Sequence, residues 1–340
     1  MMLRFRALIS LAVLFVSLGC STADKSRGSM AGNGATTRAG APEERQFQFE
    51  YATSVSGIPS NARQVRIWIP LPQSDGTQTV SNMQIDSPVP YRLTTEGLYG
   101  NRLAYFEVRN PVPQEIPVKV TFDVTRVEAK ELRWDIGDLG HIRLLEGDAL
   151  APLDGEPAAR AAQAVSGKEG VPGKARGVYD RVLDDVDYDK SGAGWGRGDI
   201  RYVCDVGKGN CSDFHTLFIG MARAERIPAF FEIGFPIPVG KAEGSVGGYH
   251  CWAWYEETDG IWRPVDASEA DKDPSRTDYF FGSLCCNRVA LTRGRDLVLD
   301  PPQDGAPINF LIYPYVEIDG TPSAAQVRKK FSFRDVDGSS

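Results

Sequence analysis

The chain has 340 residues, of which 42% are hydrophobic and 24% are charged, and this globular composition excludes a wholly disordered or fibrous protein. Its length is sufficient for two domains. The 38 basic and 45 acidic residues give a formal net charge of −7, which argues against a nucleic-acid-binding protein, because such proteins usually carry a basic surface.

An apolar stretch near the N-terminus follows Arg4 and Arg6 and covers residues 8–18. It is shorter than the ~20 residues that cross a bilayer, and it is typical of an export signal. The stretch leads into Cys20, and this junction resembles a bacterial lipobox, in which the cysteine becomes lipidated. We therefore expect residues 1–20 to be an export signal with lipidation at Cys20, the alternative being an ordinary cleaved signal peptide. The protein would then be periplasmic or on the outer surface, as a membrane-anchored lipoprotein.

Residues 21–45 are dominated by small, polar and charged side chains, with Met30 as the only large apolar one. Such a segment cannot bury enough surface to offset the entropy lost on ordering. We therefore expect a flexible linker over residues 21–45.

Apolar and polar residues alternate in three stretches between residues 46 and 128. The apolar positions are Phe47, Phe49 and Tyr51, then Val65, Ile67 and Ile69, and then Val118, Val120, Phe122 and Val124. A period of two predicts half-buried strands. Residues 46–128 are therefore predicted to form an antiparallel β-sandwich module, in which we find no catalytic constellation.

Helical spacing appears beyond residue 150. One apolar stripe consists of Ala175, Val178, Tyr179, Val182, Leu183 and Val186, and a second, in a helix beginning near Cys211 and ending at Ile227-Pro228, consists of Phe214, Leu217, Phe218, Met221 and Ala222. Strands are predicted over residues 229–235, 249–255 and 261–265. Helices followed by strands predict an α+β domain over residues 129–340.

The acidic run of residues 185–189 invites comparison with a calcium-binding loop. An EF-hand would require glycine at position 190 and glutamate at position 196, where the chain has Lys190 and Gly196. We therefore expect a solvated acidic turn.

Cys211 lies where a loop containing Gly209 enters the second predicted helix. The free N–H groups and the positive end of the helix dipole at this position stabilise a thiolate, which is the nucleophilic form of cysteine. The same N–H groups can stabilise negative charge on an acyl oxygen. Cys211 is therefore a candidate nucleophile, and a buried structural cysteine is the alternative.

His250 lies in an apolar predicted strand, where its imidazole needs a polar partner. Asp266 ends the next predicted strand, and a hairpin loop of residues 256–260 would place it directly opposite His250. The carboxylate would then orient the imidazole as a base for the Cys211 thiol. His215, four residues after Cys211, is the competing base, although no strand carboxylate is expected to hold it.

Four segments together resemble the transglutaminase-like superfamily of cysteine enzymes, and the resemblance covers residues 195–296. The segments are Gly209-Asn210-Cys211-Ser212-Asp213-Phe214, residues 222–229, Tyr249-His250-Cys251-Trp252 and residues 262–268. The resemblance implies a papain-like α+β cysteine enzyme with a catalytic triad of Cys211 as nucleophile, His250 as base and Asp266 as orienting acid.

The resemblance carries two further expectations. Bacterial members often have an N-terminal β-module, which fits residues 46–128. A side chain that stabilises the oxyanion cannot be assigned uniquely, and Trp195 and Asn210 are the candidates.

Four cysteines remain: Cys204, Cys251, Cys285 and Cys286. Disulfides persist in exported proteins, and because a bridge between adjacent cysteines would be strained, we expect Cys285 or Cys286 to pair with Cys204 or Cys251. A zinc site built from Cys204, Cys211, His250 and Cys251 is disfavoured, because the adjacent strand residues His250 and Cys251 should point to opposite faces and the chain has no paired Cys-x-x-Cys motif. We therefore expect neither a metal nor a cofactor.

The sequence thus predicts an enzyme that transfers the acyl group of a peptide or glutamine-type amide, through a cysteine thioester, to water or to an amine. The substrate would be a peptide or protein of the cell envelope. Hydrolysis is favoured because the glycine-containing segment 236–248 is expected to be an open loop beside the site. Trp252 and Trp254 could instead line an approach for an amine, or belong to the core. The alternatives are a cell-wall cysteine peptidase and a catalytically idle binding or assembly module.

Overall fold

The computed structural model describes residues 43–110, 112–323 and 327–336. The expected export signal, Cys20 and nearly all of the expected linker lie outside these residues. The first strand begins at Glu44, so the last two linker positions belong to the β-module. Within the described ranges, no helix is long and apolar enough to cross a membrane.

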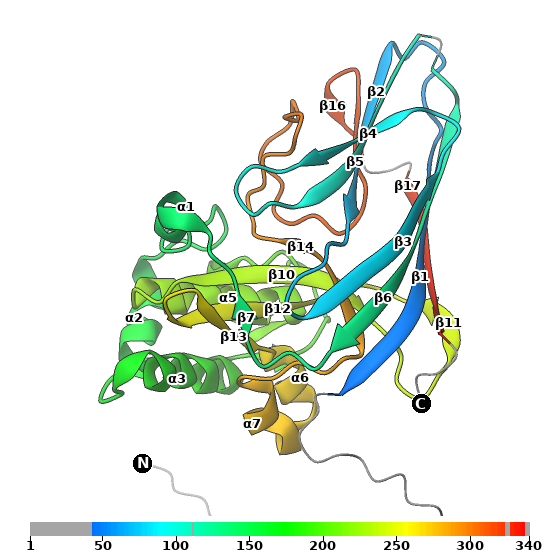
Figure 1. Ribbon diagram of the computed structural model, residues 1–340. Coiled ribbons are helices and arrows are strands. Elements are labelled where there is room, and N and C mark those ends of the chain that lie inside the picture. Colours follow the sequence, from blue (N-terminus) through cyan, green and yellow to red (C-terminus); the bar gives the residue numbers. More distant parts are fainter. Residues whose placement is uncertain (1–42, 111, 324–326, 337–340) are drawn as a thin grey trace, which may run out of the picture. The chain divides into compact units, whose positions relative to one another are not determined.

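Two five-stranded antiparallel sheets form a β-sandwich (Figure 1). Its strands are β1 (Glu44–Ser56), β2 (Gln64–Leu71), β3 (Gln78–Asp86), β4 (Tyr91–Thr95), β5 (Arg102–Arg109), β6 (Glu115–Val127), β11 (Glu243–Val246), β15 (Tyr315–Ile318), β16 (Thr321–Pro322) and β17 (Val327–Asp335). The strand order is β11-β17-β1-β6-β3 in one sheet and β16-β15-β2-β5-β4 in the other. All the alternating apolar positions that the sequence singled out are buried in the core, which confirms the predicted strands.

Strands near the C-terminus complete both sheets of the sandwich. β17 pairs with β1, and β15 pairs with β2. Phe331 of β17 packs against Phe49 and Phe235 with ring centroids 6.5 and 4.4 Å apart. The sequence analysis placed these residues in the second domain, because a local apolar pattern predicts a strand without indicating which distant strand it pairs with.

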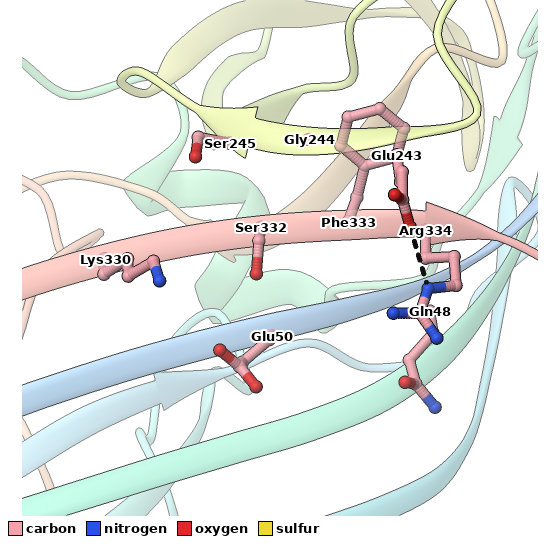
Figure 2. Close-up of a pocket in the computed structure, with 9 residues that line it drawn as sticks. All are labelled: Gln48, Glu50, Glu243, Gly244, Ser245, Lys330, Ser332, Phe333 and Arg334. Atoms are coloured by element: carbon pink, nitrogen blue, oxygen red, sulfur yellow. Dashed lines mark hydrogen bonds and ion pairs between the residues drawn. The ribbon is translucent and has the colours of Figure 1, made fainter.

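The segment of residues 236–248 also contributes to the sandwich. Its second half forms β11, which pairs with β17, and Glu243 forms an ion pair with Arg334 at 3.2 Å. A polar pocket of about 340 Å³ lies at this edge. Side chains of β1, β11 and β17 line it (Figure 2). The expectation of an open loop is therefore wrong for residues 243–246, whose backbone is held in a sheet.

The second part of the chain is built on a central antiparallel sheet. Its strands are β7 (Leu132–Arg133), β10 (Ala229–Pro236), β12 (His250–Thr258), β13 (Ile261–Val265) and β14 (Arg288–Arg293), in the order β14-β10-β12-β13-β7. The helices are α1 (Gly137–Arg143), α2 (Gly155–Ala164), α3 (Gly170–Asp185), α4 (Ile200–Val206), α5 (Cys211–Ala224), α6 (Ala267–Lys272) and α7 (Thr277–Phe280), with a 3₁₀ turn at Pro274–Arg276. The predicted helices and strands of this region are confirmed, and the whole is the α+β arrangement expected.

Helix α5 is the centre of this part of the fold (Figure 1). It packs on β10 and β12 on one side, and on α2, α3 and α4 on the others. All its residues from Cys211 to Arg223 are therefore buried, rather than one face alone as predicted. A helix that is covered on all sides by sheet and helices loses its polar face, and its buried polar groups then need partners inside the protein.

Trp252 and Trp254 of β12 are fully buried. Both indole N–H groups donate to Glu232 Oε2, at 2.6 and 2.9 Å, and Glu232 in turn accepts a hydrogen bond from Arg293 at 2.7 Å. The two tryptophans thus belong to the core, and they do not line an approach to the site.

Candidate active site

Cys211 is the first residue of α5, and side chains fix the start of that helix. Asn210 is the N-cap, and its Oδ1 accepts a hydrogen bond of 2.8 Å from the Ser212 N–H. The Asn210 N–H in turn donates to Asp213 Oδ2 at 2.8 Å, which completes a capping box. The Cys211 thiol therefore lies at the positive end of a well-capped helix, as the sequence predicted.

The chain just before Cys211 is held by a short pairing. β8 (Asp187–Tyr188) runs parallel to β9 (Lys208–Gly209), and Asp189 forms an ion pair with Lys208 at 2.7 Å. The acidic run was expected to be a solvated turn, but part of it forms strand β8, because its backbone pairs with a segment 21 residues further along the chain.

Asp213 also fixes the loop that carries Trp195. Its carboxylate is fully buried and accepts hydrogen bonds from the N–H groups of Gly196 at 2.6 Å and Gly198 at 2.9 Å. A side chain at Gly209 would approach the Asp213 Cβ to 2.4 Å, so this position requires glycine. Sequence reasoning missed this role of Asp213, although its place three residues after the N-cap was a visible signal.

His250 and Asp266 form a close buried pair. His250 Nε2 lies 2.8 Å from Asp266 Oδ2, and the two residues are 5% and 0% exposed. This contact leaves Nδ1 as the free imidazole nitrogen, and the imidazole also hydrogen-bonds with the Cys211 thiol. The structure therefore brings together the three residues predicted for the triad.

The strand register behind this pair differs from the prediction. Ala253 pairs with Val265, and the hairpin turns at Asp259-Gly260. The observed pairing is therefore shifted by two residues from the one that placed Asp266 directly opposite His250, and Asp266 comes just after the end of its strand. The predicted register is wrong because the loop is shorter than expected and a bulge lies near its end. A shift of two residues keeps each side chain on the same face, which is why Asp266 still reaches His250.

His215 has a carboxylate partner that the sequence did not suggest. Its Nε2 lies 3.5 Å from Asp266 Oδ1, in a geometry too poor for a hydrogen bond, and its Nδ1 lies 3.6 Å from Cys251 Sγ. The expectation that no carboxylate holds His215 is therefore wrong. Both histidines contact Asp266, and His250 is the one that hydrogen-bonds with Cys211.

The charges in this cluster favour an ion pair. The hydrogen bond from the Cys251 thiol and the nearby His250 hold the pKa of Cys211 well below its usual value, despite burial. Burial lowers the pKa of His250, but Asp266 and Cys211 outweigh it and raise that pKa to about 10. Burial likewise raises the pKa of Asp266, whereas His250, His215 and Arg288 together bring it well below its usual value. Thiolate, imidazolium and carboxylate are thus the stable forms at neutral pH.

Cys251 is a further residue at the site that sequence reasoning missed. Its thiol donates to the Cys211 sulfur, and its Sγ lies 3.9 Å from Ser212 Oγ. Burial and the neighbouring Cys211 raise its own pKa well above the usual value, so Cys251 remains a thiol and acts as a donor. Because Cys251 is one residue after His250, the sequence had placed it on the opposite strand face, away from the site.

The expected disulfides are not formed. The five described cysteines, Cys204, Cys211, Cys251, Cys285 and Cys286, are free thiols. Cys251 contacts α5, whereas Cys285 lies against Arg288 on the other side of Asp266. The predicted pairing is therefore wrong, because spacing in the chain does not indicate which cysteines approach each other.

Of the two candidate oxyanion residues, Asn210 lies at the start of α5, and Trp195 lies in the loop whose next residue, Gly196, is bonded to Asp213. Asn210 Nδ2 donates to the Tyr249 hydroxyl over 3.2 Å, and that hydroxyl also lies 3.2 Å from Ser212 Oγ. Trp195 is half-buried in the loop held by Asp213, and the adjacent Gly196 packs against the Asn210 amide. Tyr249 was missed as a site residue, although it immediately precedes His250 in the chain.

The third histidine lies away from this cluster. His141 Nδ1 is 3.4 Å from Glu256 Oε2, so its partner is a carboxylate of β12 rather than a residue of the site. Across the described ranges, no three His, Cys, Asp or Glu side chains are grouped so that they could hold a metal ion.

Comparison with known proteins agrees with this geometry. Residues 158–267 match the family described as the Transglutaminase-like superfamily, and this range contains Cys211, His250 and Asp266. The chain therefore contains a transglutaminase-like domain.

Two individual proteins extend the comparison. A solved structure described as "a Putative Cysteine Protease from Cytophaga hutchinsonii" has the same fold, with a TM-score of 0.55 and 14% identity over 86% of this chain and 93% of that chain. An uncharacterized protein of Haemophilus influenzae is 32% identical over 204 residues, which are 50% of this chain. The match spans 55% of that relative's length.

Selective alkylation is expected at Cys211. Its thiolate persists at neutral pH, whereas burial raises the pKa of Cys204 to about 11 and also raises that of Cys286. Cys285 is the competing thiol, because the Arg288 guanidinium lowers its pKa against the effect of burial. Mass spectrometry of folded protein treated briefly with iodoacetamide at pH 7 should find Cys211 modified first.

A Cys285→Ser variant is the control, since it removes the competing thiol and should leave the Cys211 signal in place. Faster labelling of Cys204 or Cys286 would contradict the assignment of Cys211 as the activated thiol.

Proposed function

We propose that the protein is a cysteine enzyme that transfers the acyl group of a peptide or glutamine-type amide through a thioester on Cys211. The observation that carries this proposal is the chain of contacts from Asp266 through His250 to a thiol at the N-terminus of α5. Nucleophile, base and orienting acid in this order are the arrangement that activates a cysteine for acyl transfer.

The reaction begins with the Cys211 thiolate attacking the carbonyl carbon of the amide. Backbone N–H groups at the start of α5 stabilise the oxyanion, together with Trp195 or Asn210. The His250 imidazolium gives its proton to the leaving amine, and the C–N bond breaks. Neutral His250 then takes a proton from a water molecule, whose oxygen adds to the thioester carbonyl carbon. The C–S bond breaks, the carboxylic acid is released, and Cys211 returns to its thiolate form beside the His250 imidazolium.

We propose that water, rather than an amine, is the main acceptor. Amine transfer requires an apolar approach that keeps water away from the thioester. Trp252 and Trp254, the side chains considered for such an approach, are buried and bonded to Glu232. The Cytophaga hutchinsonii protein of the same fold is described as a cysteine protease, and a protease transfers the acyl group to water, so this description also favours hydrolysis.

A glutamine-containing peptide supplied with a labelled primary amine tests the acceptor. Deamidation or backbone cleavage is expected to exceed incorporation of the amine, because water reaches the thioester without a binding site of its own. Mass spectrometry of the products distinguishes the three outcomes. Incorporation as the dominant product would overturn the preference for hydrolysis and would leave the role of Cys211 intact.

The second candidate is a catalytically idle module used for binding or assembly in the cell envelope. The burial of Cys211, which is 2% exposed, favours it, since a substrate must first displace the groups that cover the thiol. The complete set of Cys211, His250 and Asp266 favours the enzyme, because a scaffold has no need of all three.

We further propose that the protein is exported and held at a membrane by a lipid on Cys20. The apolar stretch after Arg4 and Arg6 and the polar segment after Cys20 support this placement. Its substrate would then be a peptide or protein of a bacterial cell envelope.

A further inference from the structure

A buried arginine lies against the acid of the proposed triad. Arg288, in β14, is 3% exposed, and its Nη1 donates to Asp266 Oδ2 at 3.0 Å. This oxygen is the one that also contacts His250 Nε2 at 2.8 Å. The other oxygen, Oδ1, accepts from the Glu269 N–H at 3.2 Å, as Asp266 caps α6. Arg288 is thus the charged donor that shares an oxygen with the imidazole.

The other partners of Arg288 are the Cys285 thiol and the Trp252 ring, and neither of them is a carboxylate. Its Nη2 lies 3.5 Å from Cys285 Sγ, and the guanidinium carbon lies 4.8 Å from the centre of the Trp252 ring. Its Nε has no hydrogen-bond partner among the described residues. Burying a guanidinium is unfavourable unless a carboxylate compensates, and an apolar side chain would fill the same space more favourably. The contact with Asp266 is therefore the feature that needs this arginine.

We propose that Arg288 is a positioning residue of the active site, which keeps Asp266 ionised and holds its Oδ2 in place against His250. The imidazole is then fixed with Nδ1 toward the Cys211 thiol. This inference rests on the proposed function, because a positioning role presupposes that Cys211, His250 and Asp266 form an active site. Its test measures alkylation of Cys211 and does not require turnover of a substrate.

The effect of Arg288 on the site has a definite sign. The charged and titratable groups around Arg288 are Asp266, Cys285 and, on β6, Arg126. The same Asp266 carboxylate also interacts with His250, His215, Glu269, Tyr179 of α3 and Lys272 of α6. Removing one cation destabilises the anionic forms of its neighbours, so each acid in the cluster binds its proton more tightly. Without Arg288, the Cys211 thiolate therefore forms at a higher pH.

The test measures the rate of Cys211 alkylation by iodoacetamide as a function of pH in the full chain. Arg288→Met should move the midpoint upward by about one pH unit, the size expected for loss of one charge a few ångströms from the cluster. Arg288→Lys keeps the positive charge, so its alkylation midpoint should lie close to that of the wild type. With a peptide substrate, Arg288→Met should lower kcat by about 10-fold with little change in KM, as expected for poorer proton transfer.

Arg126→Met is the matched control. Arg126 is also buried and also lies over Trp252, at 6.0 Å, but it bonds with Thr77 and Gln78 rather than with Asp266. We expect a comparable loss of stability from this variant and a smaller shift of the alkylation midpoint. If Arg288→Met does not fold, Arg288→Gln, which is neutral and retains N–H donors, carries the same expected shift.

An unchanged midpoint in a folded Arg288→Met or Arg288→Gln variant would overturn the inference, as would a shift equal to that of Arg126→Met. The proposed function fails separately. If the wild type turns over no amide but the Arg288 variants shift the alkylation midpoint, the proposed enzyme activity is wrong and the positioning role of Arg288 is supported. If the wild type turns over amide and the variants keep the wild-type alkylation midpoint, the proposed enzyme activity is supported and the positioning role of Arg288 is wrong.

Discussion

Cys211→Ala should abolish turnover of peptide or glutamine-type amides, with a loss of about 10⁴-fold or more in kcat. The reason is that the thioester forms on this sulfur, and no other described thiol lies at the start of α5 next to His250 with a lowered pKa. The measurement is the rate of product release from a labelled peptide, with circular dichroism to confirm that the variant folds.

Cys204→Ala is the matched control for this experiment. Cys204 is also a nearly buried free thiol, but it lies in α4, and its raised pKa keeps it protonated. It should retain turnover. Wild-type rates in Cys211→Ala would show that the acyl group is carried elsewhere.

His250→Ala should lower kcat by about 10³-fold, because it removes the general base and acid that contacts the Cys211 thiol. His215→Ala should cost about 10-fold or less, since His215 touches Asp266 and Cys251 and does not carry the proton. Steady-state kinetics of the two folded variants compare the bases directly. A severe loss in His215→Ala with retained activity in His250→Ala would reverse the assignment.

The pH profile gives this comparison a second readout. His250 is charged below its pKa of about 10 and neutral above it, so the proton for the leaving amine is lost as the pH rises through that value. The wild type should therefore lose activity near pH 10, and the residual activity of His250→Ala should lack this alkaline limb.

Local patterns in the sequence predicted strands β1, β2, β6, β10, β12 and β13, helices α3 and α5, and the three site residues. Alternation at Phe47, Phe49 and Tyr51 identified β1, because a half-buried strand imposes that period. Cys211 was identified from its place before an apolar helical stripe, and the structure has α5 begin at that residue. Such signals depend on a few neighbouring residues, so they can be read directly from the chain.

Contacts between distant segments could not be predicted in the same way. The pairing of β17 with β1 joins the two ends of the described chain, and nothing in the local pattern of Val327–Asp335 specifies that partner. The same holds for Arg288, which reaches Asp266 from a strand on the far side of β12 and β10. No strand was predicted around Arg288, and its partner is set by the order of strands in the sheet.

The pair of His250 and Asp266 lies between these two cases. The predicted strand register, which placed the two residues opposite each other, is wrong by two residues. The contact is present nevertheless, because side chains two residues apart in a strand lie on the same face. A register error of one residue would have placed them on opposite faces. The periodicity of the strand therefore predicted the face correctly, while the length of the turn decided the register.

The most direct test of the account is to trap the acyl group on the enzyme. Wild type and Cys211→Ala are mixed with an activated ester such as p-nitrophenyl acetate, quenched with acid during the first turnover, digested and examined by mass spectrometry. The account predicts an acetyl group on the peptide that contains Cys211 in the wild type, and no acetylated peptide in the variant. An acetyl group on Cys285, or none on any cysteine while the ester is consumed at the same rate by both proteins, would contradict it.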